Sequence, residues 1–251
     1  MVVKTSWSKV AGWYDELLSG DDTYQKEVIL PNLLRLLELQ KSERVLDLAC
    51  GQGFFAREFS KAGAKVTGVD ISAELIALAE KQSEKTIHYY IGKADELDFL
   101  PAGQFTKATI VLAMQNIENV NGVLGELKRV LMPKGKLFLV LNHPAFRIPK
   151  HSDWSYDEEE NIQYRRLAEY LSESRTNIDM HPGEEKRDYT VSFHRPLQFY
   201  FKALAKNGFS VARLEEWNSH KKSEKGPRQV AEDKARKEIP LFLLLEVVKN
   251  V

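Results

Sequence analysis

The sequence predicts an α/β fold in which helices cover both faces of a mostly parallel sheet. Between residues 44 and 142, short apolar runs alternate with stretches of helical periodicity, the pattern of repeated strand–helix units. The run "ATIVLAM" (108–114) is apolar throughout, which is typical of a central strand buried on both faces. Residues 45–56, "VLDLACGQGFFA", lead from a buried strand through a glycine turn into a helix. We therefore expect the ligand at the carboxyl ends of the strands.

The first forty residues predict a helical extension before the sheet. Their apolar side chains at 28, 29, 33, 36 and 37 share one helical stripe, and Pro31 predicts a break or restart of the helix.

The core then follows as alternating elements. We expect strands at 44–49, 65–70, 86–92, 108–114 and 136–142. Helices are expected at 54–63, where Gly63 stops the helix, at 72–82, where Ser72 caps it, and at 119–132, where Pro133 ends it.

Residues 143–188 interrupt this rhythm with an aromatic and charged insertion that shows no strand of the buried type. Ser155 and Glu158 have the spacing of a capping box, so we expect a helix from about Ser155, with the acid run 157–160 favoured by the helix dipole. Insertions at the ligand end of an α/β sheet often act as lids.

The core is expected to resume at residue 189. "YTVSFH" (189–194) predicts a strand, and residues 195–208 a helix with Pro196 in its first turn and Gly208 beyond its end. Residues 209–217 and 241–249 predict the final two strands. The mixed charges between them indicate a solvated loop or helix face, with a basic partner-binding patch as the alternative. The prediction is a single domain with a cap at 1–40, a core at 41–142, a lid at 143–188 and a closing part at 189–251.

Composition narrows the class of protein. Basic and acidic residues are equal at 36 each, which disfavours a large nucleic-acid footprint. One cysteine, Cys50, suits a reducing compartment, and we find no signal peptide and no spacing typical of a metal site. The longest apolar run, 239–248, contains Glu246 and is far shorter than the ~20 residues that a membrane span requires. We therefore expect a cytoplasmic protein without a membrane segment, while the oligomeric state stays open.

The chemistry of the glycine turn depends on Asp47. Gly51, Gly53 and Ala56 satisfy the loose fingerprint of a dinucleotide site, but a carboxylate beside that turn would repel a phosphate. It would attract a cation such as S-adenosylmethionine, which carries an ammonium and a sulfonium group. Asp70 ends the second strand, where an acid can accept hydrogen bonds from both ribose hydroxyls. The alternative to these ligand-binding roles is structural: Asp47 would be a buried structural acid, and Asp70 an ordinary turn residue.

These segments resemble the class I S-adenosylmethionine-dependent methyltransferases. "VLDLACGQG" looks like the family's first motif, with Ala49 in place of its first glycine, and "VTGVDIS" like its second. "GKADELDF", "VLAMQNI" and "ELKRVLMPKGKLFLV" match later segments, and "FHRPLQFYFKALAKNGF" resembles family members that act on small molecules. The resemblance implies a Rossmann-like, doubly wound sheet of seven strands, the last one antiparallel. It also implies S-adenosylmethionine as cofactor and S-adenosylhomocysteine as product.

The resulting site prediction covers four motifs and the N-terminal segment. The predicted cofactor-binding residues are Tyr14, Asp47, Ala49, Gly51, Gly53, Phe54, Asp70, Ile71, Ala94, Asp95, Glu96, Ala113 and Met114. By the resemblance, Asp95 meets the adenine amino group, although Glu96 and Asp98 compete for that place. Tyr14 and Tyr24 close over the cofactor or only pack in the core. Cys50 as a nucleophile is disfavoured, because no histidine is adjacent to it in sequence.

The predicted acceptor side comes from the segment after strand five. His143 is a candidate general base, with a structural histidine as the alternative. Arg195 is predicted to hold an acidic group of the substrate, or to pair with lid acids at 158–160. The remaining predicted substrate contacts are Phe146, Trp154, Tyr164 and His194.

The sequence thus predicts a methyltransferase that acts on an oxygen, nitrogen or carbon atom of a small molecule. An RNA methyltransferase, a nicotinamide-dependent oxidoreductase and a non-catalytic cofactor-binding protein are the alternatives.

Overall fold

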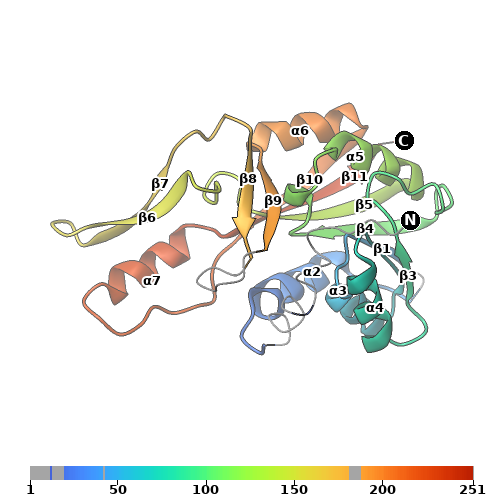
Figure 1. Ribbon diagram of the computed structural model, residues 1–251, viewed down its shortest axis with the longest axis horizontal. Helices are drawn as coiled ribbons and strands as arrows, with labels where there is room; N and C mark the ends of the chain where they lie inside the picture. The colour runs from blue at the N-terminus through green and yellow to red at the C-terminus, as the bar shows by residue number, and fades with distance from the viewer. Residues whose placement is uncertain (1–11, 13–19, 42, 181–187, 251) are drawn as a thin grey trace.

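A seven-stranded mixed sheet forms the centre of the protein in a computed structural model that describes residues 12, 20–41, 43–180 and 188–250 (Figure 1). The strands lie in the order β10-β11-β5-β4-β1-β2-β3. Their bounds are β1 Arg44–Leu48, β2 Lys65–Asp70, β3 His88–Ile91, β4 Phe105–Val111, β5 Leu131–Asn142, β10 Phe209–Trp217 and β11 Phe242–Lys249.

Strand direction separates the last strand from the others. Strands β1 to β5 pair in parallel, whereas β11 is antiparallel to both of its neighbours, β5 and β10. The order reverses between β1 and β4, so their carboxyl ends diverge there and leave room for a ligand. The predicted Rossmann-like sheet, with its last strand antiparallel, is confirmed.

Helices cover both faces of this sheet, with α2, α3 and α4 on one face and α5 and α6 on the other (Figure 1). Their bounds are η1 Gln25–Ile29, α2 Leu30–Leu37, α3 Phe54–Lys61, α4 Ala73–Gln82, α5 Val120–Val130 and α6 Leu197–Lys206. One apolar cluster joins α5 and α6 to β1, β4, β5 and β11, and a second joins α2 and α3 to the opposite face. The five apolar residues of the predicted N-terminal stripe are all buried in the second cluster.

Local signals explain several helix ends. Ser72 accepts a hydrogen bond from the Leu75 backbone N–H at 3.3 Å and caps α4, as the sequence predicts. Pro31 lies in the first turn of α2, where a missing N–H costs nothing, so the helix restarts there. Gly208 follows α6 with a φ of 77°, a conformation that glycine adopts without steric cost.

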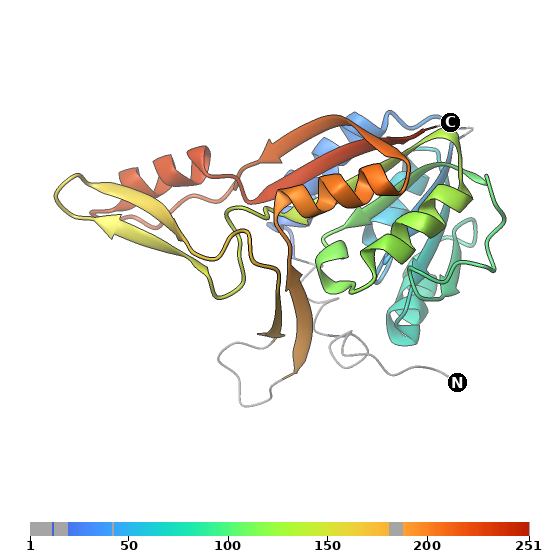
Figure 2. The ribbon, with the colours of Figure 1, turned by 90° about the horizontal axis from the view of Figure 1, so that it is seen from above.

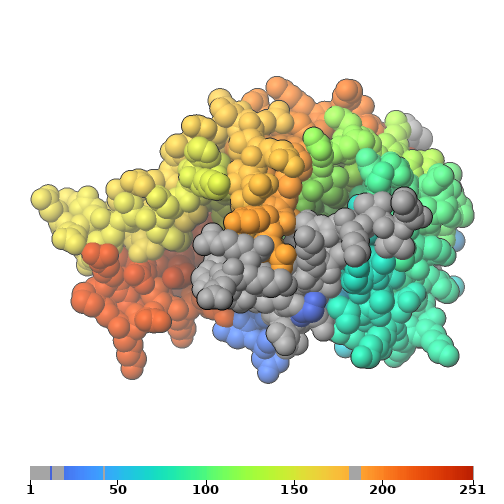
Figure 3. Space-filling view, in the orientation of Figure 1, coloured from blue at the N-terminus to red at the C-terminus, as the bar shows by residue number. Residues whose placement is uncertain are grey.

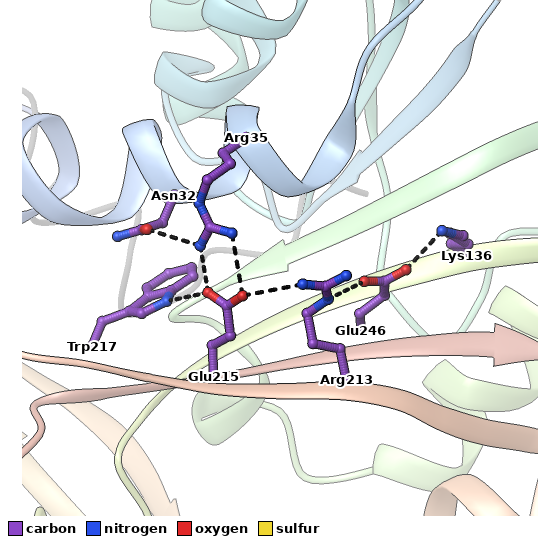
Figure 4. Close-up of polar contacts among 7 residues, drawn as sticks. All are labelled: Asn32, Arg35, Lys136, Arg213, Glu215, Trp217 and Glu246. Atoms are coloured by element: carbon purple, nitrogen blue, oxygen red, sulfur yellow. Dashed lines mark hydrogen bonds and ion pairs between the residues drawn. The ribbon is translucent and has the colours of Figure 1, made fainter.

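A chain of charged side chains ties α2 to the edge of the sheet (Figure 4). Arg35 of α2 pairs with Glu215 of β10 at 2.5 Å, and Arg213 lies 3.2 Å from Glu246 of β11. Lys136 of β5 reaches the other oxygen of Glu246 at 2.7 Å. Glu246 is the acid inside the longest apolar run, and its burial is offset by these two cations.

The chain after β5 builds an arm that projects from the core (Figure 2). It contains β6 Ser152–Asp157 and β7 Ile162–Leu167, which form a hairpin, and β8 Ser174–Asp179 and β9 Tyr189–His194, which form another. Helix α7, Gln229–Glu238, lies beside the first hairpin, and the two form the narrow end of the molecule (Figure 3). Arg228 joins them, 4.3 Å from the centre of the Tyr156 ring and 3.0 Å from Glu158.

The predicted helix from about Ser155 is wrong, because this segment is the β6–β7 hairpin. Its side chains alternate with a period of two, and aromatic residues such as Trp154 and Tyr156 favour strands. Asp157 accepts hydrogen bonds from the backbone N–H groups of Glu159 and Glu160, both at 3.0 Å. The acid therefore stabilises a turn between two strands, where the sequence analysis placed the start of a helix.

Other differences concern strands. Residues 189–194 form a strand as predicted, but it pairs with β8 in the arm and not with the core sheet. The insertion therefore extends beyond residue 188 and contains strands, against expectation. Strand β4 ends at Val111 and not at 114, because Met114 to Asn116 form the short helix η2. Residues 218–238 contain α7, in line with the predicted loop or helix face.

Among the described residues, no helix combines the length and the apolar character that crossing a membrane demands.

Candidate active site

A cavity of about 640 Å³ lies at the carboxyl ends of β1, β2 and β4. Its floor consists of the loop after β1, the end of β2, the segment after β3 and the segment after β4. Four residues of the β8–β9 hairpin complete its wall, namely Arg175, Thr190, Val191 and Phe193. The volume falls within the range of small-molecule sites, ~300–1,000 Å³.

The loop after β1 owes its shape to left-handed backbone at alternating positions. Ala49, Gly51 and Gly53 have φ values of 58°, 56° and 78°. Only glycine adopts this region without cost, so Ala49, where the methyltransferase motif has its first glycine, carries a strain of about 1 kcal/mol. A Cβ at Gly53 would lie 2.4 Å from the Tyr89 hydroxyl oxygen, so this glycine serves packing beneath the loop.

Asp47 presents a buried carboxylate to the cavity. One of its oxygens accepts a hydrogen bond from the Thr109 hydroxyl at 2.8 Å. The other oxygen, Oδ2, is buried and has no hydrogen-bond partner among the described residues. Burial, with the nearby charge of Asp70, raises the pKa of Asp47 to about 7. An orphaned buried carboxylate oxygen in a cavity wall creates a place for a cationic or hydrogen-donating ligand group.

Asp70, the last residue of the neighbouring strand β2, holds two loops together at the cavity. Its carboxylate accepts hydrogen bonds from the backbone N–H groups of Gly51 and Ser72, both at 2.9 Å. Each carboxylate oxygen has a second lone pair, so the side chain keeps acceptor capacity toward the cavity. Burial raises the pKa of Asp70.

Most of the predicted cofactor-binding residues meet at this one cavity. Those that line it are Asp47, Ala49, Gly51, Phe54, Asp70, Ile71, Ala94, Asp95 and Ala113. Three others do not line it: Gly53 packs on Tyr89, Glu96 pairs with Lys93 at 2.6 Å, and Met114 is buried in the core. Tyr14 lies outside the described residues. Cys50 lines the cavity, but burial raises the pKa of its thiol, which does not favour a nucleophile.

The predicted substrate residues do not line this cavity. Phe146 packs against the ring of His143, and Trp154 and Tyr164 belong to the β6–β7 hairpin. His194 is buried, and one of its ring nitrogens bonds the carbonyl of Tyr170 at 2.8 Å. Tertiary pairing of the arm, which the sequence did not reveal, carries these side chains away from the floor of the site.

Arg195 has a structural environment that neither sequence interpretation anticipated. It is buried between the rings of Phe193 and Phe199. Its guanidinium donates to the carbonyl oxygens of Ile117 and Glu118, both at 2.9 Å, and to that of Met114 at 3.4 Å. The predicted pairing with acids 158–160 is wrong, since Glu158 pairs with Arg228 instead. Arg195 therefore fixes the segment after β4 that forms one wall of the cavity.

His143 is also enclosed by protein contacts. It is 1% exposed, and its Nδ1 accepts a hydrogen bond from the Ala145 backbone N–H at 3.2 Å. Nε2 then carries the proton and donates to Glu216 at 2.8 Å. Burial lowers the pKa of His143. Both ring nitrogens are engaged and the residue does not line the cavity, so its position favours the structural alternative over a general base.

We therefore expect His143→Ala to lower the free energy of unfolding by about 1–3 kcal/mol, because it leaves the Ala145 N–H without its acceptor. Denaturant unfolding measures the change. The exposed His88 provides a matched control, and His88→Ala should stay within ~0.5 kcal/mol of the wild type. Equal stability of the His143 variant and the wild type would contradict the structural role.

The sequence analysis missed the contribution of the β8–β9 hairpin and of Asn116. Asn116 lines the cavity and donates to the Val191 carbonyl at 2.7 Å, which links the floor to the hairpin. The position of Asn116 directly after the fourth strand could have predicted that it lines the cavity. The sequence of the β8–β9 hairpin contains no pattern that predicts its contacts with the cavity. Among the described residues, no group of acids, histidines and cysteine could hold a metal ion.

Comparison with known proteins agrees with this geometry. Residues 46–139 match a protein family described as a methyltransferase domain. A demethylmenaquinone methyltransferase from Chlorobaculum parvum is 31% identical over 143 residues, which are 55% of this chain and 58% of the relative. A ubiquinone biosynthesis O-methyltransferase from Xanthomonas oryzae is 29% identical over 99 residues, covering 38% and 41% of the two chains. The alignments thus span about half the length of these relatives.

A solved structure extends the similarity over most of the chain. The S-adenosylmethionine-dependent methyltransferase from Mesorhizobium loti is 26% identical and superposes with a TM-score of 0.69. The match covers 87% of this chain and 96% of that protein. The motif match, the sheet order and this similarity together support a class I S-adenosylmethionine-dependent methyltransferase, with its methyltransferase domain at residues 46–139.

Proposed function

We propose that this protein transfers the methyl group of S-adenosylmethionine to an oxygen, nitrogen or carbon atom of a small organic molecule. The observation that carries the proposal is the orphaned carboxylate oxygen of Asp47 in a cavity that the β8–β9 hairpin walls off. A roof of this kind suits a small acceptor better than a polymer. The names of the quinone methyltransferases to which the chain is similar support the same class of acceptor.

The residues around the cavity fit the cofactor. Asp47 Oδ2 would accept from the ammonium group, and Asp70 would accept from the ribose hydroxyls with its remaining lone pairs. Asp95, which accepts a hydrogen bond from Asn119 at 2.9 Å, would meet the adenine amino group. Phe54, Ile71 and Ala94 provide the apolar contacts. A pyrophosphate would meet two buried acids here, which argues against a nicotinamide cofactor.

S-adenosylmethionine, held by Asp47, Asp70 and Asp95, would supply an electrophilic methyl group, and the proton of the acceptor would pass to solvent. The protein contributes orientation: the segment after β4, held by Arg195 and Asn116, fixes the wall beside the acceptor. No histidine is among the described residues that line the first cavity. We therefore expect the positioning of the acceptor and the exclusion of water to provide most of the rate acceleration.

The test uses S-adenosylmethionine with a labelled methyl group and a cell extract divided into small-molecule, RNA and protein fractions. We expect label in the small-molecule fraction only. Label in RNA would refute the small-acceptor assignment and favour the RNA alternative. Binding of NADH in place of S-adenosylmethionine, measured by calorimetry, would refute the cofactor assignment.

The affinity for S-adenosylmethionine should rise with pH through about 7. The pKa of Asp47 in the free protein is about 7, and only its ionised form attracts the ammonium group. Below that pKa, the dissociation constant should increase by up to ~10-fold per pH unit. Calorimetry between about pH 5.5 and 7.5 keeps the ligand ammonium protonated. Asp47→Asn is the control: it should bind more weakly and lose this pH dependence, and an unchanged profile would exclude Asp47 as its origin.

We further propose that the arm between β5 and α6 is the lid that selects the acceptor. Its β8–β9 hairpin supplies Arg175, Thr190, Val191 and Phe193 to the cavity wall. The single-domain organisation and the cytoplasmic location remain predictions from the sequence.

A further inference from the structure

A second, smaller cavity of about 310 Å³ lies at the carboxyl end of β5, next to the first. Asn142, the last residue of β5, lines it together with Gln115, which exchanges two hydrogen bonds with the Asn142 backbone at 2.8 and 3.0 Å. Phe193 of β9 lines both cavities, so the two cavities adjoin at this residue.

The walls of the second cavity are strongly cationic. Arg147, Lys150 and Arg165 line it, and its described lining contains no aspartate or glutamate. Polar residues also line it, among them His194, which the sequence predicted as a substrate contact; the others are Gln115, Asn142, Ser152 and Ser192. Three like charges around one small space repel each other unless an anion lies between them.

Arg165 is held in place by neutral partners. Its Nε donates to the Phe146 carbonyl at 2.9 Å, and its Nη2 donates to the Ser152 hydroxyl at 2.9 Å. The guanidinium also lies 5.2 Å from the centre of the Trp154 ring. Burial and the charge of Arg147 lower the pKa of Arg165. The positive charge is thus fixed in orientation but not neutralised by these contacts.

Arg147 lacks even neutral partners. Within the described part of the chain, its side chain forms no hydrogen bond and no ion pair, and the residue is exposed to solvent at the rim of the cavity. The outward-facing neighbour of Arg165 provides a contrast, because Arg166 pairs with Asp153 at 2.6 Å. An exposed guanidinium without an acid partner keeps its donors free for an anionic ligand group that enters the cavity.

We propose that the second cavity binds a carboxylate or phosphate group of the methyl acceptor, between Arg147 and Arg165. This inference rests on the proposed methyl transfer and names its substrate class, a small organic anion. A guanidinium pair recognises the planar or tetrahedral oxygen groups of such anions bidentately. The acidic group would anchor the acceptor while the rest of the molecule extends past Phe193 toward the first cavity.

The anion site is tested with inorganic phosphate and with benzoate, each titrated into the full chain by calorimetry. We expect both probes to bind and to compete with each other. Arg147→Gln should raise both dissociation constants at least tenfold, while Arg166→Gln, the adjacent arginine outside the cavity, should leave them unchanged. Equal binding by the wild type and Arg147→Gln, or no binding of either probe, would overturn the site. Because the Arg147 side chain forms no hydrogen bond or ion pair with the described residues, and its backbone bond to His143 is kept, the substitution should not unfold the protein.

A second measurement decides whether the acceptor or free phosphate is the natural ligand. Small molecules that gain label in the extract experiment are passed over an anion exchanger at neutral pH. We expect the labelled product to be retained, and Arg147→Gln to raise the KM for that acceptor without changing the affinity for S-adenosylmethionine. A labelled product that is not retained would overturn the acceptor assignment, even if phosphate binds. No label in any fraction would instead count against methyl transfer itself.

Discussion

Asp70→Ala is expected to weaken the binding of S-adenosylmethionine by more than tenfold. The substitution removes the acceptors for the ribose hydroxyls and also releases the backbone N–H of Gly51, which Asp70 holds at 2.9 Å. Both effects act on the nucleoside side of the cavity. Calorimetric titration at pH 7.5, where Asp47 is mostly ionised and the ligand ammonium mostly protonated, measures the change.

Two controls keep this result interpretable. Glu96 is a nearby acid that pairs with Lys93 and does not line the cavity, so Glu96→Ala should change the affinity by less than twofold. Circular dichroism and the unfolding midpoint show whether Asp70→Ala keeps the fold. An unchanged affinity in a folded variant would remove Asp70 from the ribose site.

Arg195→Met is expected to lower the free energy of unfolding by about 3–5 kcal/mol. The arginine is 5% exposed and donates to three carbonyl oxygens of residues 114–118. Methionine fills part of the volume but leaves these buried acceptors without donors. Denaturant unfolding gives the value, and the same variant should lose affinity for the cofactor because the cavity wall loosens.

A lysine ammonium does not reproduce the planar set of N–H donors of the Arg195 guanidinium. Arg195→Lys should therefore restore less than half of the free energy of unfolding that Arg195→Met loses. Arg166, exposed and paired with Asp153, offers the matched control, and Arg166→Met should cost less than ~1 kcal/mol. A stable Arg195→Met variant would show that the segment after β4 is held by other contacts.

Much of the core was predictable because its signals are local. The Ser72 cap, Gly208 and the apolar stripe of the N-terminal extension each act within a few residues, and the structure has all three. Strand ends in a parallel sheet meet at one edge, so Asp47 and Asp70 could be placed at one site from the pattern alone.

The arm was not predictable in the same way. Ser155 and Glu158 have the spacing of a helix start, but the segment forms a hairpin because cross-strand partners and α7 cover it. α7 is separated from this hairpin by more than sixty residues, so no local pattern reports the contact. For His143 and Arg195 the sequence left a chemical and a structural role open, and burial makes both residues structural in their contacts.

Periodicity and motif spacing specify local conformation, so the α/β core, the order of its elements and the meeting of Asp47 and Asp70 at one cavity follow from the sequence. Which polar side chains of residues 143–195 face a cavity, and which bond to protein groups, follows only from the folded arrangement. That choice depends on pairing between distant segments, where burial fixes whether a charge is neutralised. Arg147 and Arg165 remain without an acid partner among the described residues for this reason, and their shared cavity is where the acceptor is to be sought.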